Sequence, residues 1–344
     1  MQEQFPVLRS LDLGADKETM FVTDAFLGGS APLLQKISLG GNIRFPGLPK
    51  LLSSTRDLVD LNLRGIPMTD EGHIPPDAMA TCLSVLNRLR SLTIAFLRQK
   101  SSSYPTDQHP PPSTYTVLPA LTYLWLEAPH GYLEDLVGRV DAPLLDSGHL
   151  DFYDEPIFDT PRVPQFFHRT IMFKLFSEVT VWFRRVRIFF EAGIFASFRS
   201  SIGPATFSFS FPCSEFPAQV ATMERICSQW PSLFSHVELL RLNDDFIEQR
   251  NWSEANTTAW LEFLRSFNAV QTLRLGGTAT ELHVAYILGL LKGERATEVL
   301  PALCTINSNR SDPGASDILG LSGPFLAARK ESGHPVVVTA DSKY

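Results

Sequence analysis

Leu8-Arg-Ser-Leu11-Asp-Leu13 is the first copy of an LxxLxL motif, and six further copies match it in register. The alternating leucines predict a β-strand with one buried face, and the leucine three residues upstream is placed to enter the same core. Seven matches in a chain of 344 residues are more than composition alone produces. The further copies are Leu34-Gln-Lys-Ile37-Ser-Leu39, Leu58-Val-Asp-Leu61-Asn-Leu63, Leu89-Arg-Ser-Leu92-Thr-Ile94, Leu121-Thr-Tyr-Leu124-Trp-Leu126, Val237-Glu-Leu-Leu240-Arg-Leu242 and Val270-Gln-Thr-Leu273-Arg-Leu275.

Weaker copies continue the series through the middle and the end of the chain. Gly148 takes the place of the central leucine in one of them, and from Leu11 to Cys304 the copies recur about every 29 residues. The weaker copies are Leu145-Asp-Ser-Gly148-His-Leu150, Phe176-Ser-Glu-Val179-Thr-Val181, Phe207-Ser-Phe209-Ser-Phe211, Cys304-Thr-Ile306 and Val336-Val-Val338.

The stretches between these strands carry apolar residues at helical spacing, and proline and glycine mark the joints. We therefore predict an α/β leucine-rich-repeat solenoid of about 11 irregular repeats, with a curved parallel sheet on the concave side and helices on the convex side. A doubly wound α/β sheet is the alternative, but it needs no shared LxxLxL motif, and its usual glycine-rich first turn is missing. The expected helices span residues 76–89, 132–140, 217–230, 257–267 and 280–291.

Composition excludes several classes of protein. With 30 Lys+Arg against 37 Asp+Glu and a net charge of −7, the chain lacks the positive field that nucleic-acid binding needs. No apolar run is long enough to cross a membrane. Four cysteines without CxxC spacing make no disulfide framework, and no secretory signal opens the chain, so we expect an intracellular protein, cytoplasmic or nuclear.

The motif runs through the chain without a composition break that would divide domains, so residues 1–344 are expected to form a single leucine-rich-repeat domain. Residues 99–113 are polar and rich in Pro and Ser, which predicts a loop inserted within one repeat. A polyproline-type docking motif is the alternative reading of that insertion. Residues 308–344 are expected to form a C-terminal capping segment.

Four stretches go beyond the repeat motif: Ala31-Pro-Leu-Leu-Gln-Lys-Ile-Ser-Leu39, Leu118-Pro-Ala-Leu-Thr-Tyr-Leu-Trp-Leu126, Ala142-Pro-Leu-Leu-Asp-Ser147 with the stretch 152–166, and Phe325-Leu-Ala-Ala-Arg329 with Gly333-His-Pro-Val-Val-Val338. Through them the chain resembles the leucine-rich-repeat region of the F-box-like proteins that are abundant in mushroom-forming fungi. The resemblance covers nearly the whole chain, although its motifs are mostly structural.

The resemblance implies the substrate-receptor half of an SCF-type ubiquitin ligase, in which repeats hold the substrate while an upstream F-box docks onto an adaptor and cullin. The F-box itself is absent from these residues, which open directly on a repeat at Leu8. A truncated gene model and a divergent copy that kept only the recognition half both fit this departure. An adaptor and a cullin are therefore expected as partners only if an F-box is supplied upstream.

No pattern of residues predicts catalysis, a metal or a cofactor, so we expect no enzyme. Cys82 and Arg88 match the Cys-x5-Arg spacing of a phosphatase loop, but the residues between them are helical and apolar. Gly320-Leu-Ser-Gly323 falls short of a nucleophile elbow. The remaining candidates have plainer interpretations: the eight histidines as surface or capping residues, the acidic run Asp151, Asp154, Glu155 and Asp159 as a solvated rim, and Arg184, Arg185 and Arg187 as a salt-bridged helix-like turn.

The side chains between the buried leucines define the candidate binding site. They are expected to face the concave side, where strands about 4.8 Å apart place them in rows. The central row is predicted as Asp12, Ser38, Asn62, Thr93, Trp125, His149, Thr180, Ser208, Arg241, Arg274 and Thr305. Exposed aromatic and arginine side chains favour protein binding there, whereas a long loop folded over them is the competing interpretation. The predicted partner-binding residues are Tyr123, Trp125, Glu127, His149, Asp151, Trp182, Arg241 and Arg274.

The sequence thus predicts a protein-recognition scaffold similar to the substrate-receptor repeats of an F-box subunit. A leucine-rich-repeat module that binds protein without any link to ubiquitination is the alternative.

Overall fold

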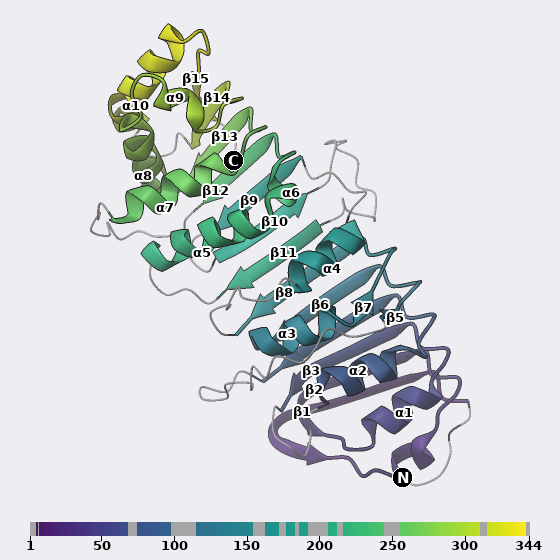
Figure 1. Cartoon of the computed structure of the whole chain (residues 1–344). Coiled ribbons are helices and arrows are strands. Elements are labelled where there is room, and N and C mark those ends of the chain that lie inside the picture. The colour runs from purple at the N-terminus through teal and green to yellow at the C-terminus, as the bar shows by residue number, and fades with distance from the viewer. Residues whose placement is uncertain are drawn as a thin grey trace. The chain divides into compact units, whose positions relative to one another are not determined.

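The structure is a computed structural model in which the chain divides into two compact units, Met1–Phe173 and Lys174–Tyr344. Both units are α/β (Figure 1). The predicted insertion at 99–113 lies outside the described residues, and the expectation of a single repeat domain stays a prediction. The structure describes residues 5, 7–67, 74–97, 115–153, 162–171, 177–182, 186–191, 206–211, 216–243, 255–309 and 315–341.

The first unit alternates strands with short helices. Its main sheet has the order β1-β2-β3-β4-β6-β8, so the strands of this sheet follow one another in chain order. The small strands β5 and β7 pair with each other instead. The elements are β1 (Ser10–Phe21), the 3-10 helix η1 (Phe26–Gly29), β2 (Lys36–Arg44), α1 (Leu48–Ser54), β3 (Asp60–Ile66), α2 (Pro76–Leu83), β4 (Ser91–Phe96), β5 (Thr116–Val117), β6 (Tyr123–Ala128), α3 (His130–Val137), β7 (Val140–Asp141), β8 (Ser147–Phe152) and α4 (Arg162–Ile171).

Every strand pair of this sheet is parallel, and the LxxLxL motifs align across it. The residues at the central leucine position are partners from strand to strand, from Leu11 at one end to Gly148 at the other. The leucines of the motif are buried: Leu61 and Leu63 have no exposed surface, and Leu124 and Leu126 are 2 % exposed. The predicted strand register and buried face are therefore confirmed in this unit.

The second unit continues the pattern of strand and helix. Leu240, Leu273 and Ile306 are partners on parallel strands and are buried. Its elements are β9 (Glu178–Trp182), β10 (Val186–Glu191), β11 (Thr206–Phe211), α5 (Phe216–Gln229), α6 (Pro231–Phe234), β12 (Leu239–Asn243), α7 (Ala255–Arg265), β13 (Thr272–Gly276), α8 (Thr278–Gly289), α9 (Arg295–Glu298), β14 (Thr305–Asn309), α10 (Ala315–Glu331) and β15 (Val337–Asp341). All five helices expected from the sequence are present across the two units, as α2, α3, α5, α7 and α8.

Strand β10 departs from the predicted arrangement. It runs antiparallel to both β9 and β11, and the local order β11-β10-β9-β12 places it between them. The prediction of a helix-like turn at Arg184, Arg185 and Arg187 is wrong for Arg187, which lies in β10, while Arg184 and Arg185 lie outside the described residues. The run Val186-Arg-Ile-Phe-Phe-Glu191 alternates too weakly for the motif to find it, but β-branched and aromatic residues favour a strand.

The C-terminal stretch 308–344 contributes helix α10 and strand β15. Arg329 in the last turn of α10 is 1 % exposed, and its Nη2 donates hydrogen bonds to the carbonyls of Pro301 at 3.1 Å and Leu303 at 2.7 Å. These two bonds fasten the end of α10 to the turn that precedes β14. Among the described residues, no helix is long and apolar enough to cross a membrane.

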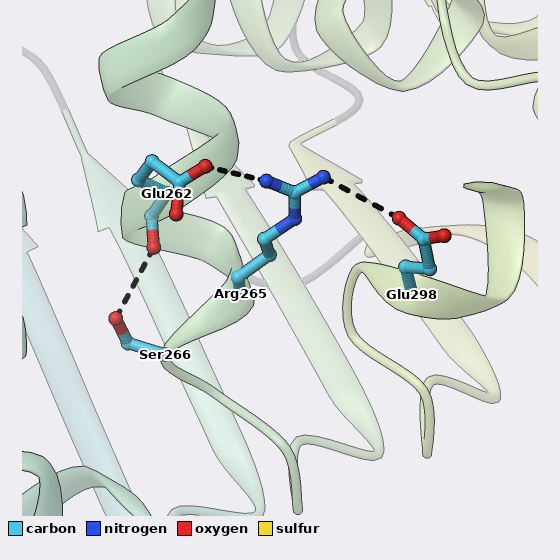
Figure 2. A network of polar contacts seen from close by, with 4 residues as sticks. All are labelled: Glu262, Arg265, Ser266 and Glu298. Atoms are coloured by element: carbon cyan, nitrogen blue, oxygen red, sulfur yellow. Dashed lines mark hydrogen bonds and ion pairs between the residues drawn. The ribbon is translucent and has the colours of Figure 1, made fainter.

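One surface ion pair links helices α7 and α9 of the second unit, and a second lies within α7 (Figure 2). Arg265 of α7 pairs with Glu262 one turn earlier, and its Nη2 lies 3.4 Å from Oε2 of Glu298 on α9. The Ser266 hydroxyl donates to the backbone carbonyl of Glu262 at 3.2 Å. Because these side chains are partly exposed, each pair contributes at most about 1 kcal/mol, and buried apolar residues carry the stability of this unit.

Two glycines permit irregularities in the first sheet. Gly41 pairs with Ala15 at a register shift between β1 and β2, and Gly65 lies at a second shift between β3 and β4. Both have positive φ, +85° and +72°, which only glycine adopts at low cost. A Cβ at Gly41 would also overlap the backbone carbonyl of Ala15.

Gly41→Ala should therefore lower the free energy of unfolding by about 2 kcal/mol or more, because it combines a left-handed backbone with a steric overlap. Gly40→Ala is the matched control, since an added Cβ there would meet no heavy atom of the described structure within 4 Å. Urea titration of both variants checks this. Equal losses of unfolding free energy in the two variants would contradict the requirement for glycine at the register shift.

The core makes a second prediction. Leu61 is fully buried in β3, so Leu61→Ala should cost about 2–5 kcal/mol of unfolding free energy through lost contacts and a cavity. Ser38→Ala, one strand away on the opposite face of the same sheet, should cost little. Urea titration compares them, and a loss below about 0.5 kcal/mol for Leu61→Ala would show that this residue lies outside the core.

Candidate functional site

Strands β6 and β8 bring together five of the predicted partner-binding residues. Between the buried leucines of β6, the side chains of Tyr123, Trp125 and Glu127 are half-buried and lie on the opposite face, which we call the polar face of the first unit. His149 and Asp151 are partners of Trp125 and Glu127 on β8 and have the same intermediate exposure. The alternation that predicted these orientations is confirmed.

The predicted central row is confirmed across the first unit. Each residue is the direct partner of the next through the five strand pairs, and Trp125 stands between Thr93 of β4 and His149 of β8. The confirmed row is Asp12, Ser38, Asn62, Thr93, Trp125 and His149.

Ring and cation–π contacts join Trp125 to its neighbours on the polar face. The ring centroids of Trp125 and His149 are 5.4 Å apart, and those of Tyr123 and His149 are 6.0 Å apart. The guanidinium carbon of Arg64 lies 5.2 Å from the centroid of the Trp125 ring, within the range of a cation–π interaction. We call Arg64, Tyr123, Trp125 and His149 the Trp125 cluster.

Arg64 was not among the residues predicted for the site. It lies on β3, two strands away from Trp125 on β6, and its side chain spans β4 to reach the indole ring. The residues of β4 on this face are small, and Thr93 and Ala95 are only 4 % and 8 % exposed. The sequence contains the parts of this contact, namely a long arginine side chain on one strand, small residues on the next and Trp125 on the third. Their diagonal arrangement can be recognised only when the register of the three strands is known.

Burial sets the electrostatics of the cluster. Desolvation raises the pKa of the Tyr123 phenol, and the positive charge of Arg64 opposes that shift. Desolvation also lowers the pKa of His149 below its ordinary value of 6.5, because the half-buried site disfavours the charged imidazolium. The lowered pKa favours the neutral imidazole at pH 7, the phenol is neutral there even at its ordinary pKa, and Arg64 is the charged member of the cluster.

The second unit holds the remaining predicted residues. Arg241 of β12 forms an ion pair with Glu178 of β9 and is in register with Arg274 of β13. Arg274 is half-buried, and its Nε is buried without a hydrogen-bond partner among the described residues. The backbone of Trp182 lies in β9 opposite Asn243, and its side chain lies outside what the structure describes.

Two members of the predicted central row are misplaced in the second unit. Arg274 pairs with Asn307, whereas Thr305 pairs with Thr272, so Thr305 lies two residues along its strand from the predicted row. Ser208 is separated from Thr180 by Phe189 of the antiparallel strand β10. The Cys304-Thr-Ile306 match was aligned on too few residues to fix its register, and β10 was not foreseen.

The structure does not assemble the Cys82 and Arg88 pair into a phosphate loop. Cys82 is buried in α2, and burial raises the pKa of its thiol despite an opposing hydrogen bond from Ser53. Arg88 instead pairs with Asp57 at 2.9 Å on the surface. The sequence Gly320-Leu-Ser-Gly323 lies within helix α10, and of the acidic run only Asp151 falls among the described residues.

The structure contains a buried ionisable cluster that the sequence did not predict. His130 and Glu134 of α3 are each 6 % exposed and lie 3.6 Å apart, so the expectation that every histidine is a surface or capping residue is wrong for His130. Beside them, Asp135 forms an ion pair with Arg162. The spacing of four residues between His130 and Glu134 was the available signal, since it places both on one face of a helix.

Such a cluster can indicate a catalytic centre, but the contacts assign it a structural role. Oε2 of Glu134 accepts a hydrogen bond of 3.2 Å from the backbone N–H of Val163 in the first turn of α4, and Arg162 starts the same helix. The two carboxylates therefore hold the positive N-terminal end of α4 against α3. No group of three or more His, Cys, Asp or Glu residues in the described part of the chain is arranged to hold a metal ion.

Comparisons with models of known protein families and with curated proteins find no match to this chain.

The pKa of His149 makes a testable prediction. Because the folded state binds its proton less readily than the unfolded state does, stability should be complete above about pH 6.5 and should fall as the pH drops below that value toward the folded-state pKa. His149→Gln should lose less stability than the wild type over this window. Urea titrations from about pH 7.5 to 5 measure it, and identical pH profiles for the two proteins would contradict the desolvation of His149.

Proposed function

We propose that this chain is a protein-recognition module of the leucine-rich-repeat type and that the polar face of its first unit binds a protein partner around Trp125. The observation that carries the proposal is the half-buried Trp125 on the strand face opposite the buried leucines. Large aromatic side chains flanked by arginine are the usual anchors of protein interfaces. The contacts within the Trp125 cluster also hold Trp125 in one orientation, which reduces the ordering cost of binding.

The repeat architecture is part of the proposal. Parallel strands that repeat in register, each with a helix or turn before the next strand, support a solenoid of about 11 irregular repeats. Strand β10 interrupts this pattern between β9 and β11 and makes the count approximate. An intracellular protein without catalysis of its own fits this architecture, since Cys82 is buried and the charged cluster of α3 and α4 serves helix packing.

The resemblance to mushroom-type F-box-like proteins gives the proposal its most specific form, the substrate-receptor half of an SCF-type ubiquitin ligase. The alternative is a repeat module that binds its partner without any link to ubiquitination. Affinity purification followed by mass spectrometry separates the two, because it detects adaptor, cullin and substrate together. Recovery of a substrate without adaptor or cullin, from cells that express the complete gene, favours the alternative.

The binding face is tested by Trp125→Ala. We expect the free energy of binding to the partner recovered by affinity purification to weaken by about 2 kcal/mol or more, the effect of removing a central aromatic anchor. The unfolding free energy should fall less, by about 1 kcal/mol, because the ring is half-buried and its main loss is the contact with Arg64. Titration calorimetry and thermal melts on the same proteins measure both.

Ser38→Ala and Leu61→Ala are the matched controls. Ser38 lies on the same row as Trp125, three strands away, and its replacement should change neither binding nor melting. Leu61→Ala should lower the melting temperature while leaving the polar face chemically intact. If Trp125→Ala lowers the melting temperature as much as Leu61→Ala does and leaves the affinity unchanged, Trp125 is a structural residue and the proposal fails.

A further inference from the structure

Arg64 is held on two sides by its neighbours. Its Nε donates a hydrogen bond of 3.1 Å to Oδ1 of Asn62, and its guanidinium carbon lies 5.2 Å from the centre of the Trp125 ring. The hydrogen bond uses the Nε edge, and the cation–π contact places the guanidinium beside the indole ring. The two Nη groups at the end of the guanidinium therefore remain as an oriented pair of donors.

No carboxylate of the described residues neutralises this guanidinium. The acidic residue on its own strand, Asp60, lies 3.8 Å from Lys36 of β2. Glu127 shares the row of Arg64 but is separated from it by Ala95. Arg64 is also exposed, so its positive charge faces solvent beside the aromatic rings.

The row that contains Arg64 carries no side chain on β1 and β2. Arg64 is in register with Gly40 of β2, which is in register with Gly14 of β1. A methyl group at either glycine would meet no heavy atom of the described structure within 4 Å. On β1 and β2 this row therefore carries no side chain that would block a partner segment lying beside Arg64 of β3.

We infer that Arg64 binds a carboxylate of the protein partner, so that the bound segment carries Asp or Glu next to an apolar side chain that packs on Trp125 and Tyr123. This inference rests on the proposed function and specifies the chemistry of the partner at the same cluster. Paired N–H donors in one plane match the two oxygens of a carboxylate. A phosphate carries nearly two negative charges and would be bound better by two cations. Lys36 already pairs with Asp60, so a carboxylate fits this site better than a phosphate does.

Selection of short random peptides displayed on phage tests the inference. The full chain is immobilised as wild type, Trp125→Ala and Arg64→Glu, and peptides that bind wild type but not Trp125→Ala are sequenced. We expect these peptides to share an acidic residue beside an apolar one. Selection on Arg64→Glu should replace that acidic residue by Lys or Arg, because the charge of the binding site is reversed.

Synthetic copies of the selected peptides give the quantitative measurement. By fluorescence anisotropy, Arg64→Gln should raise the Kd about tenfold or more, because it removes a charge-assisted pair of hydrogen bonds. Arg64→Lys should recover part of the affinity, since it keeps the charge and loses the planar pair of donors. The peptide with Gln in place of its acidic residue should bind wild type as weakly as the original peptide binds Arg64→Gln. Thermal melts confirm that each variant is folded.

The outcomes separate the inference from the proposed function. Peptides that need Trp125 but contain no acidic residue, or that bind Arg64→Gln as well as wild type, would overturn the inference and leave the proposed function standing. If no selected peptide depends on Trp125, both are wrong.

Discussion

The first unit depends on one constraint, the burial of equivalent leucines on neighbouring parallel strands. A strand alternates its side chains strictly between two faces, so a shift of one residue would expose Leu61 and Leu63 and bury Asn62. Each buried leucine thus fixes the register of its own strand and that of both neighbours. At the two register shifts of this sheet, Gly41 and Gly65 adopt a positive φ that other residues adopt only at a cost.

The same constraint builds the Trp125 cluster. Fixed register makes Thr93, Trp125 and His149 neighbours, although they are 32 and 24 residues apart in the sequence. The small side chains of β4 then let Arg64 reach the indole ring from β3. Half-burial lowers the pKa of the His149 imidazole and so favours its neutral form. Arg64 then supplies the one positive charge of the cluster, so the site combines an apolar surface with a single charged donor.

The sequence predicted the parts of the fold that follow from local periodicity. The burial of Leu124 and Leu126, the opposite orientation of Trp125 and the positions of five helices could all be derived from spacing alone. Contacts that join distant segments could not. Arg64 reaches Trp125 only because the register aligns their strands, and Glu134 meets the backbone of Val163 only because α3 and α4 pack together. Strand β10 lacks the leucine motif and could not be predicted from it. The position of Ser208 relative to Thr180 therefore could not be predicted either.

Strand β10 also has a consequence for how the second unit folds. Its antiparallel partner β9 ends at Trp182, only four residues before β10 begins at Val186. By contrast, the connection between the parallel strands β12 and β13 contains all of α7. Local hairpins of this kind form in about 1–10 μs, while parallel pairs carry a larger loop-closure entropy and are slower. The antiparallel pairing of β9 with β10 is therefore expected to form faster than the parallel pairs of this unit.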